Sequence, residues 1–329
     1  MSRREGRPGL RVLRLALILL VCLGVAAGIL ATLAGFLASW APTLEWPNHF
    51  RPYVLVGAGL LLGLALVLRH RRLVAAAGVF LTVVLALFLL PFAYAAPRAD
   101  GSDPGLRIVT FNAWVGNKRT EDIARFLESA NADIVLLQES EALRRVLLPR
   151  LKATYPHAYC SGQNCNQALL AKRPWVDAGS VNQAGRNPLI VWARFEHDGL
   201  AYEVIGLHIA WPFHPDRQAR HVDWLIEHVR SRTVPVIMAG DFNLTPFSWK
   251  LTKLAHMTGL RRSATLLASW PGHRLWPAFL IDHVFSSREF AVRDVRIGPP
   301  LGSDHLPVIA DVELQTQQSA GTPMRPMQP

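Results

Sequence analysis

Cysteine is scarce in this chain, with three residues among 329. Cys22 lies in an apolar stretch, whereas Cys160 and Cys165 enclose a turn-like segment that has only His157 nearby as a further metal ligand. A structural zinc site typically needs about four such ligands, so the composition argues against one. Two alternatives remain open for the pair, namely a local disulfide, which an oxidising compartment permits, and two free thiols.

Acidic residues are also few, and no internal repeat is present. The chain has 24 Asp plus Glu against 35 Lys plus Arg, which gives a formal net charge of +11. Residues 1–103 contribute more than half of the excess, because they carry ten arginines and only four acids. This part of the charge is a membrane-topology signal rather than a nucleic-acid signal. The mild basic bias of residues 104–329 suits an anionic substrate without identifying one.

Charged residues are missing altogether from three apolar stretches, Leu15–Ala38, Tyr53–Leu68 and Leu73–Ala96. A helix needs about 20 apolar residues to cross the hydrocarbon core, so the first and third are long enough and the second lies at the short end of the range. We predict a membrane anchor over residues 1–96 with three transmembrane helices, at about 15–38, 52–68 and 73–96. A cleaved signal peptide is the alternative for the first stretch, but its length and the two later stretches favour a retained helix.

The distribution of arginine predicts the orientation of this anchor. The basic leader, which includes Arg3, Arg4 and Arg7, and the loop at residues 69–72 are both expected in the cytoplasm. The loop 40–52 has one arginine and is expected outside. After three crossings, the rest of the chain would be extracytoplasmic.

Residues 106–313 are predicted to fold into one domain, preceded by a linker at 97–105 and followed by a disordered tail at 314–329. Helices are predicted over 120–130, 141–153, 215–230 and 246–258, the last capped by Thr245. Strands are predicted over 107–111, 134–137, 168–171, 189–195, 202–207, 236–239, 282–285, 292–297 and 308–312. Because several strands follow one another without a helix between them, this order favours packed mixed sheets over a strict βαβ series.

Polar strings follow several of these strands. In Gly-Asp-Phe-Asn at residues 240–243, the alternation of a strand would point Asp241 and Asn243 into one cleft and Phe242 away from it. The carboxylate could then orient and deprotonate a water molecule, while the amide holds the carboxylate or a phosphate oxygen. The alternative is an Asx turn that serves only the backbone.

Ser-Asp-His at residues 303–305 precedes the last predicted strand. His305 could donate to a phosphoryl oxygen and stabilise the charge that develops there. Asp282 is the natural carboxylate to fix the tautomer of that histidine. Taken singly, each residue is better explained by a structural role, with His305 bonded to a carbonyl and Asp282 at a strand edge.

Glu139 and Asn112 each come after an apolar strand. A lone carboxylate in an open, hydrated position is what Mg²⁺ uses. The alternative for Glu139 is a surface glutamate at a helix start, where the helix dipole favours it. Asn112 could contact metal or phosphate, or be an ordinary turn residue.

His208 ends another predicted strand, and Trp211 and Phe213 follow it. The histidine could place a second imidazole over the phosphate or the leaving oxygen, with the aromatic rings lining a substrate groove. For the two aromatic residues we favour core packing or a membrane-interface position.

Taken jointly, the strings resemble the endonuclease/exonuclease/phosphatase superfamily, also called DNase I-like. The resemblance covers about residues 106–313, and Thr245–Ser248, Trp270–Pro271 and Ile281–His283 are similar to a bacterial membrane-anchored subgroup. It implies a four-layer α/β/β/α sandwich of two packed mixed sheets, here preceded by the three transmembrane helices. A bacterial inner-membrane location is expected with it.

The resemblance also implies roles for the site residues. Glu139 would bind Mg²⁺ or Mn²⁺, with Asn112 and Asp304 close to metal or phosphate. Asp241 would position or deprotonate the water, Asn243 would orient it, and His305, supported by Asp282, would bind the scissile phosphate. In having histidine at position 208, the chain resembles the DNase I-like branch rather than the exonuclease III-like branch, where tyrosine is usual at this position.

These expectations describe a divalent-metal-dependent phosphoesterase that uses direct water attack. Its substrate is either DNA, which we favour slightly, or a lipid headgroup or small phosphate ester. The residues expected to contact the substrate are Trp211, Asn112 and Asn243. A non-catalytic binding module on the same fold is the alternative from another class. The lipid bilayer is the expected partner of the N-terminal helices, and no protein partner is predicted.

Overall fold

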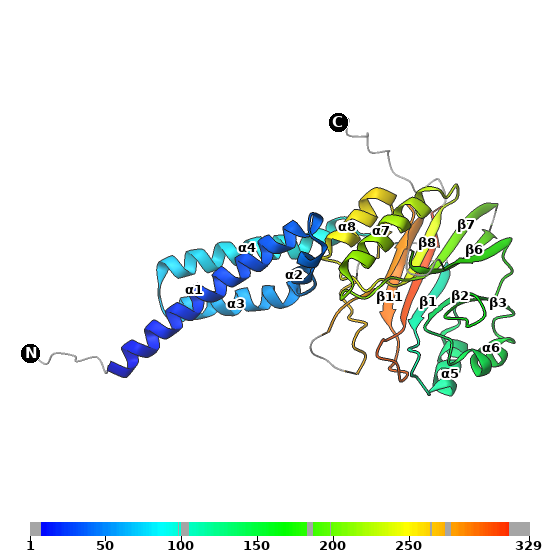
Figure 1. Cartoon of the computed structure of the whole chain (residues 1–329), viewed down its shortest axis with the longest axis horizontal. Helices are drawn as coiled ribbons and strands as arrows, with labels where there is room; N and C mark the ends of the chain where they lie inside the picture. The colour runs from blue at the N-terminus through cyan, green and yellow to red at the C-terminus, as the bar shows by residue number, and fades with distance from the viewer. Residues whose placement is uncertain are drawn as a thin grey trace, which may run out of the picture. The chain divides into compact units, whose positions relative to one another are not determined.

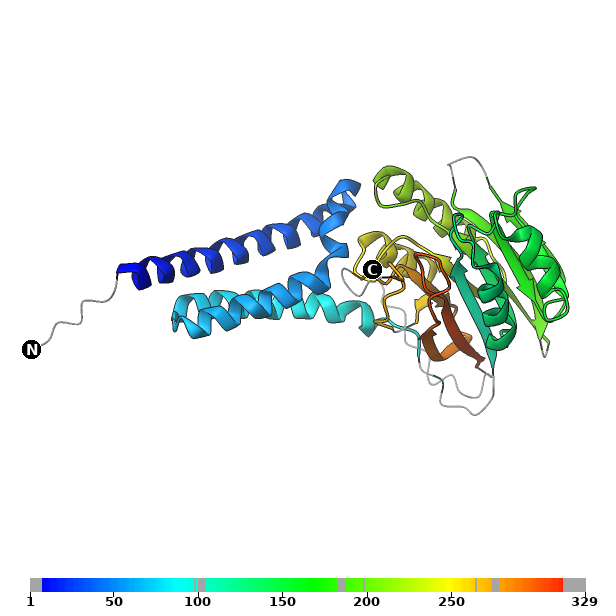
Figure 2. The same cartoon turned by 90° about the horizontal axis from the view of Figure 1, so that it is seen from below.

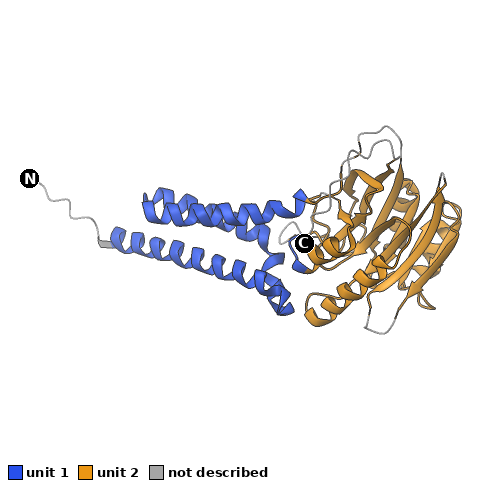
Figure 3. Cartoon of the chain, turned by 90° about the horizontal axis from the view of Figure 1, so that it is seen from above, with its two compact units in different colours: residues 1–93, 246–249 blue, residues 94–245, 250–329 orange. Residues whose placement is uncertain are grey.

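The computed structural model describes residues 8–97, 99, 105–182, 187–197, 199–263, 265–273 and 278–315. The chain divides into two compact units, one of residues 1–93 with 246–249 and one of residues 94–245 with 250–329 (Figure 3). Three predicted features lie outside the described residues, namely the arginines at positions 3, 4 and 7, most of the linker 97–105, and the tail from residue 316.

The first unit consists mainly of three long helices, α1 (Pro8–Phe36), α3 (Arg51–Val67) and α4 (Arg71–Ala93), which lie alongside one another (Figures 1 and 2). Short helical turns, including α2 (Trp46–His49), join α1 to α3. Small residues such as Ala58 and Ala77 pack at their contacts, while leucines such as Leu30 and Leu60 are exposed on the outer surface. An outward apolar surface of this kind suits lipid.

Two of these helical segments are long and apolar enough to cross a membrane, Gly9–Ser39 and Arg71–Ala93. A third crossing is counted if Pro42–His49 and Arg51–Val67, which meet at a bend of 55°, form a single broken span. The described part of the predicted anchor therefore contains two candidate spans, or three if the bent pair counts as one. These helices are consistent with membrane association.

The second unit contains two six-stranded sheets. The first sheet has the order β11 (Phe290–Ile297), β12 (Val308–Leu314), β1 (Leu106–Asn112), β2 (Ile134–Gln138), β4 (Gln167–Ala171) and β3 (His157–Cys160). The second has the order β5 (Asp177–Val181), β6 (Leu189–His197), β7 (Leu200–His208), β8 (Val236–Asp241), β10 (Asp282–Ser286) and β9 (Arg261–Arg262). The β1–β2 and β7–β8 pairs are parallel and their other neighbours antiparallel, so the prediction of mixed sheets is confirmed.

Three apolar clusters separate four layers. Side chains such as Phe111 and Leu127 join the first sheet to α5 (Thr120–Ala130) and α6 (Arg144–Leu151). Leu136 and Val204 belong to the cluster that fills the space between the sheets. A third cluster joins the second sheet to α7 (Pro215–Arg230) and α8 (Trp249–Thr258). Figure 1 shows the two helix pairs on opposite sides of the sheets, which confirms the α/β/β/α sandwich.

Two predicted helices are shorter than expected. The helix predicted over 141–153 is α6, which begins at Arg144 because Ser140–Leu143 forms a turn. The helix predicted from residue 246 begins at Trp249, so the prediction that Thr245 caps it is wrong.

The sequence did not predict β3, β5 or β9, which all lie at the edges of their sheets. The strands β3 and β5 are half-buried, so neither has the continuous apolar run that marks a central strand, and β9 has only two residues. The two cysteines left open by the sequence form a disulfide, Cys160–Cys165. Two residues of the predicted linker are also attached, because Pro97 and Ala99 exchange backbone hydrogen bonds with Val292.

Candidate active site

Strand register brings the predicted residues to one end of the sheets. His208 is the parallel partner of Asp241 at the end of β7 and β8, and Asp282 is the antiparallel partner of Asp241 at the start of β10. In the first sheet, Asn112 pairs with Gln138, so Glu139 follows at the same end. Residues that are distant in sequence therefore become neighbours through hydrogen-bonded strand pairing.

The Asn112 amide connects the two sheets at this end. Its Nδ2 donates to Glu139 Oε1 at 3.0 Å and to Asp241 Oδ2 at 3.1 Å, while its Oδ1 accepts the Trp114 backbone N–H at 3.0 Å. Asp241 is fully buried, whereas the Glu139 side chain is 21% exposed. One amide therefore joins the two carboxylates, of which Asp241 is buried and Glu139 is partly exposed to solvent.

The Gly-Asp-Phe-Asn string has a local structural reason at each position. Gly240 has φ +153°, and a Cβ there would lie 2.0 Å from the backbone oxygen of Leu207, so only glycine lets β8 lie this close to β7. Phe242 is buried and packs against Phe285 with ring centroids 5.3 Å apart, which confirms that it points away from the cleft. The buried Phe242 ring at this turn therefore fixes the direction in which the Asp241 side chain points.

Asn243 holds the Asp241 carboxylate. Its backbone N–H donates to Asp241 Oδ1 at 2.9 Å, and its Nδ2 donates to Asp241 Oδ2 at 3.2 Å and to the Ile209 carbonyl at 3.0 Å. The first of these bonds is the Asx turn that the sequence offered as an alternative, so the turn and the site geometry coexist. Because both amide hydrogens bond within the protein, Asn243 has its side-chain oxygen left to offer a water molecule.

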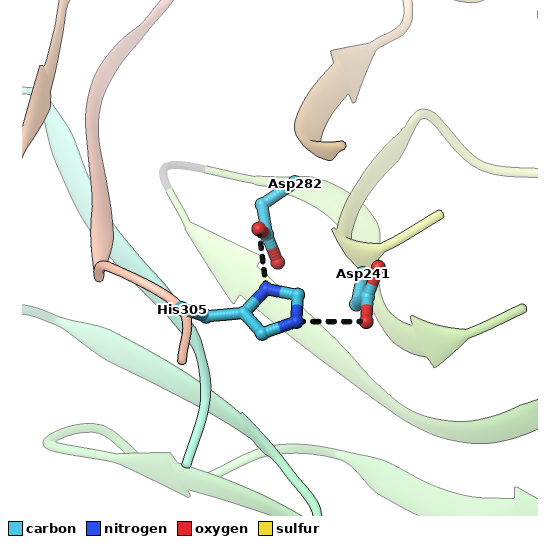
Figure 4. A group of neighbouring side chains, drawn as sticks. All are labelled: Asp241, Asp282 and His305. Atoms are coloured by element: carbon cyan, nitrogen blue, oxygen red, sulfur yellow. Dashed lines mark hydrogen bonds and ion pairs between the residues drawn. The ribbon is translucent and has the colours of Figure 1, made fainter. Parts of the chain in front are cut away.

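His305 and Asp282 form a buried pair (Figure 4). His305 Nδ1 lies 2.8 Å from Asp282 Oδ2, and its Nε2 lies 3.6 Å from Asp241 Oδ2. Burial lowers the pKa of His305, but the negative charges of Asp282 and Asp241 outweigh it and raise the pKa to about 10. The alternative that His305 is bonded to a carbonyl is therefore wrong, since its partner is a carboxylate.

A second imidazole, that of His208, lies near the Asp241 carboxylate. His208 Nε2 lies 3.4 Å from Asp241 Oδ2 and 3.9 Å from Glu139 Oε1. Burial raises the pKa of Asp241, against the opposing charge of His305. A carboxyl group with a raised pKa in a cleft is a recurrent mark of acid–base function.

Aromatic rings border the Ser-Asp-His loop. Asp304 Oδ2 accepts the indole N–H of Trp270 at 3.0 Å, and Trp211 contacts Trp270 edge-on with centroids 6.1 Å apart. Trp211 also stacks on Phe213 at 5.9 Å, and these two residues are 40% and 66% exposed. Core packing, one of the two alternatives favoured for these residues, is therefore wrong, whereas the membrane-interface position stays a prediction.

Three further residues position this site. Ser303 Oγ donates to the Asn112 carbonyl at 2.7 Å and accepts the His305 backbone N–H at 3.0 Å, which ties the loop to β1. Ser269 Oγ accepts the backbone N–H of Asp282 at 3.2 Å. Gln218 Nε2 donates to the carbonyls of Ala210 and Asn243, both at 3.0 Å.

The sequence contained a usable signal for one of these residues. Gln218 occupies a position on α7 that lies four residues before Val222 and seven before Leu225, on the apolar face of the helix. A polar residue there needs a partner, because an unpaired buried amide is costly. Ser269 carried no comparable local signal.

Two sets of side chains at this end could hold a metal ion. Ligand atoms of Asp241, Asp282 and His305 lie within 4.8 Å of one another. However, the Nδ1 of His305 bonds to Asp282, and the charges of Asp282 and Asp241 raise the pKa of the imidazole to about 10, so a cation bound by this set would have to displace a proton. The partly exposed Glu139 carboxylate, beside the Asn112 amide, fits a hard divalent cation better because such ions prefer oxygen ligands and keep water.

The sequence model of the Endonuclease/Exonuclease/phosphatase family matches residues 109–305. No curated protein matches the chain.

Solved structures share the fold at low sequence identity. An endonuclease/exonuclease/phosphatase from Beutenbergia cavernae DSM 12333 has TM-score 0.53 and 18% identity, covering 64% of this chain and 72% of its own. The human Nocturnin catalytic domain with bound sulfate anion has TM-score 0.54 and 16% identity, covering 67% and 97%. A mutant beta toxin from Staphylococcus aureus with bound magnesium ions has TM-score 0.50 and 15% identity, covering 63% and 99%.

These structural matches show that the chain shares their fold. The family match spans more than half of the chain and includes the residues from Asn112 to His305 described above. The protein belongs to the Endonuclease/Exonuclease/phosphatase family.

Proposed function

We propose that this protein is a membrane-anchored, divalent-metal-dependent phosphodiesterase that hydrolyses its substrate by direct attack of water. Family and fold support a phosphoester hydrolase of the nuclease or phosphatase type. The observation that carries the finer proposal is the Asn112 bridge between Glu139 and Asp241, at 3.0 and 3.1 Å. A cation-holding carboxylate and a water-activating carboxylate must share one pocket for this chemistry.

Glu139 would hold Mg²⁺ or Mn²⁺ through its carboxylate oxygens, with Asp304 as a further carboxylate, while the Asn112 amide orients Glu139 through its Nδ2–H. Carboxylate oxygens are ligands that hard cations prefer, and the beta toxin with bound magnesium ions supports the choice by analogy. When bound, the cation supplies Lewis-acid stabilisation of charge on the phosphate oxygens.

Asp241 acts in the proposal as the general base. Burial raises its pKa, so it accepts a proton from the attacking water more readily than an ordinary aspartate does. Asn243 keeps the carboxylate oriented through two hydrogen bonds and offers its oxygen to the same water. The water oxygen forms the new bond to phosphorus, and its proton passes to Asp241.

His305 acts as the charged donor to the phosphate. With its pKa raised to about 10, His305 remains an imidazolium at neutral pH. Asp282 accepts a hydrogen bond from Nδ1, so Nε2–H faces Asp241 and the proposed phosphate position. His208 provides a second imidazole for the leaving oxygen. Cleavage of the P–O ester bond then gives a phosphate monoester and an alkoxide, which takes up a proton from solvent and leaves as an alcohol.

The roles of Asp241 and His305 are tested with the full chain in detergent micelles, using bis(p-nitrophenyl) phosphate and Mg²⁺. Asp241→Asn and His305→Ala should each lower kcat by about 10²-fold or more while leaving the thermal unfolding transition in place. His256→Ala, which changes an exposed histidine on α8, is the matched control and should keep wild-type activity. Wild-type turnover by either site variant would refute the assigned roles.

The substrate class is the next question, and DNA is the candidate that we propose first. The exposed Trp211–Phe213 stack supports it, because flat nucleobases stack on such rings. Cleavage of single-stranded DNA that weakens steeply with added salt would support a nuclease.

The second candidate substrate is a phospholipid headgroup or small phosphate ester. The apolar N-terminal helices support it, since they would keep the catalytic unit near a bilayer. Hydrolysis of phospholipid vesicles without cleavage of DNA would select this candidate. A calorimetric titration in which the chain binds no Mg²⁺ would instead favour a non-catalytic binding module.

We also propose that the catalytic unit lies outside the cytoplasm of a bacterial inner membrane. The arginine distribution supports this orientation, and so does the Cys160–Cys165 disulfide, because disulfides persist in oxidising compartments. Protease added to spheroplasts should digest the catalytic unit. Full protection until the membrane is lysed would contradict the orientation.

A further inference from the structure

Glu139 has a backbone conformation that needs support from its surroundings. Its φ is +52°, in the left-handed region that residues other than glycine rarely occupy. Such a conformation is unfavourable for residues other than glycine and persists only where neighbouring structure determines it. This conformation points the Glu139 carboxylate to the Asn112 amide at 3.0 Å and the Val115 backbone N–H at 3.2 Å.

The support comes from the residue that follows. Ser140 is buried, and its backbone N–H donates to the Asn166 carbonyl at 3.0 Å while its Oγ donates to the Cys165 carbonyl at 2.6 Å. Asn166 adds a third contact, donating its Nδ2 to Glu141 Oε1 at 2.9 Å. The chain on the C-terminal side of Glu139 is thus held by two consecutive residues of another loop.

That loop is closed by the disulfide. Cys160 is the last residue of β3. Cys165 is buried, has a positive φ (+53°) as Glu139 does, and directly precedes Asn166. Ser161 adds a backbone hydrogen bond to the Gln167 carbonyl at 2.9 Å at the start of the loop. The covalent link therefore fixes the two carbonyls that Ser140 contacts relative to β3.

We propose that the Cys160–Cys165 disulfide and Ser140 position Glu139 for cation binding, so that reduction of the disulfide weakens the binding of Mg²⁺. This inference rests on the proposed function of Glu139. Reduction by a dithiol transfers two electrons and two protons to the disulfide, which gives two cysteine thiols and converts the dithiol to a cyclic disulfide. The site would then be complete only in an oxidising compartment.

The test compares the oxidised full chain in detergent micelles with the same chain treated with dithiothreitol. Isothermal titration with Mg²⁺ should show a Kd that is about 10-fold or more weaker after reduction, as expected when a group that orients a metal ligand is lost. Hydrogen exchange of the peptide containing Ser140 should become faster, because its N–H loses a fixed acceptor.

Variants separate this effect from general loosening of the protein. Cys160→Ser with Cys165→Ser should reproduce the weak Mg²⁺ binding of the reduced protein and no longer respond to dithiothreitol. Cys22→Ser, the control, should bind and respond like the wild type. Ser140→Ala keeps the disulfide and should still weaken Mg²⁺ binding.

The Mg²⁺ titration distinguishes failure of the positioning role from failure of the proposed function. If the oxidised wild type binds Mg²⁺ and reduction changes neither the Kd nor the exchange of the Ser140 peptide, the positioning role is refuted and the proposed function stands. If the oxidised wild type binds no Mg²⁺, the proposed function is refuted, and this inference with it.

Discussion

Replacing Asp282 by asparagine tests how the buried His305 pair works. Asp282 Oδ2 lies 2.8 Å from His305 Nδ1. Burial lowers the pKa of His305, but the charge of Asp282 is the largest of the effects that raise it, and the pKa rises from 6.5 to about 10. At pH 8, a group with a pKa of about 10 is about 99% protonated. The asparagine side chain is close in shape to aspartate but carries no charge, so burial would then favour neutral imidazole.

The expected effect on turnover follows from losing one charged donor to the transition state. Such losses lower kcat by about 10²–10³, or about 3–4 kcal/mol in activation free energy. In the wild type, kcat should fall only as pH rises through about 10, whereas in Asp282→Asn the fall should begin at a lower pH. The assay is the pH profile of bis(p-nitrophenyl) phosphate hydrolysis from pH 6 to 10 at saturating Mg²⁺.

The pair also has a pH-dependent effect on stability. Because the folded pKa of His305 is raised, its contribution is fully present below pH 6.5 and is lost as pH rises through about 10. The free energy of unfolding of Asp282→Asn should therefore differ most from wild type below pH 6.5. Asp294→Asn, at an exposed ion pair with Arg296, is the matched control and should change stability by less than about 1 kcal/mol. A kcat for Asp282→Asn within twofold of this control across the range would refute the reasoning.

Three other substitutions test separate parts of the site. Asn112→Ala removes the donor shared by two carboxylates and should weaken Mg²⁺ binding about 10- to 100-fold, measured by calorimetry; unchanged affinity would contradict the bridge. Gly240→Ala places a Cβ 2.0 Å from the Leu207 oxygen and should lower the midpoint of thermal unfolding as well as activity; a wild-type midpoint would show that β7 and β8 can separate at no cost. Trp211→Ala should raise KM for single-stranded DNA with little change in kcat, and equal KM values would remove this ring from the substrate site.

The sequence predicted the central strands well, and it also predicted which polar side chains lie at their ends, because both depend on local patterns. Buried strands such as β2 and β8 are continuous apolar runs that end at the polar strings, so the strand ends identify the site. Asp241 and Asn243 alternate about a buried aromatic residue, and this spacing alone predicts that both face one side.

The remainder depends on long-range contacts that no local pattern encodes. Ser140 begins a turn instead of a helix because its side chain bonds to a carbonyl 25 residues away. Ser303 fixes the loop of His305 through a carbonyl 191 residues away, at the end of β1. The pairing of Asp282 with Asp241 is equally a product of sheet register. The disulfide was left open because spacing alone fits both a bridge and two thiols.

The central claim is that Glu139 and Asp241 flank one divalent cation, and diffraction data from crystals of the full chain grown with Mn²⁺ test it most directly. The account predicts an anomalous peak at about 2.0–2.2 Å from a Glu139 carboxylate oxygen, on the Asn112 side of the cleft. A single peak coordinated by Asp282 and His305, with Glu139 making no contact to it, would contradict the account.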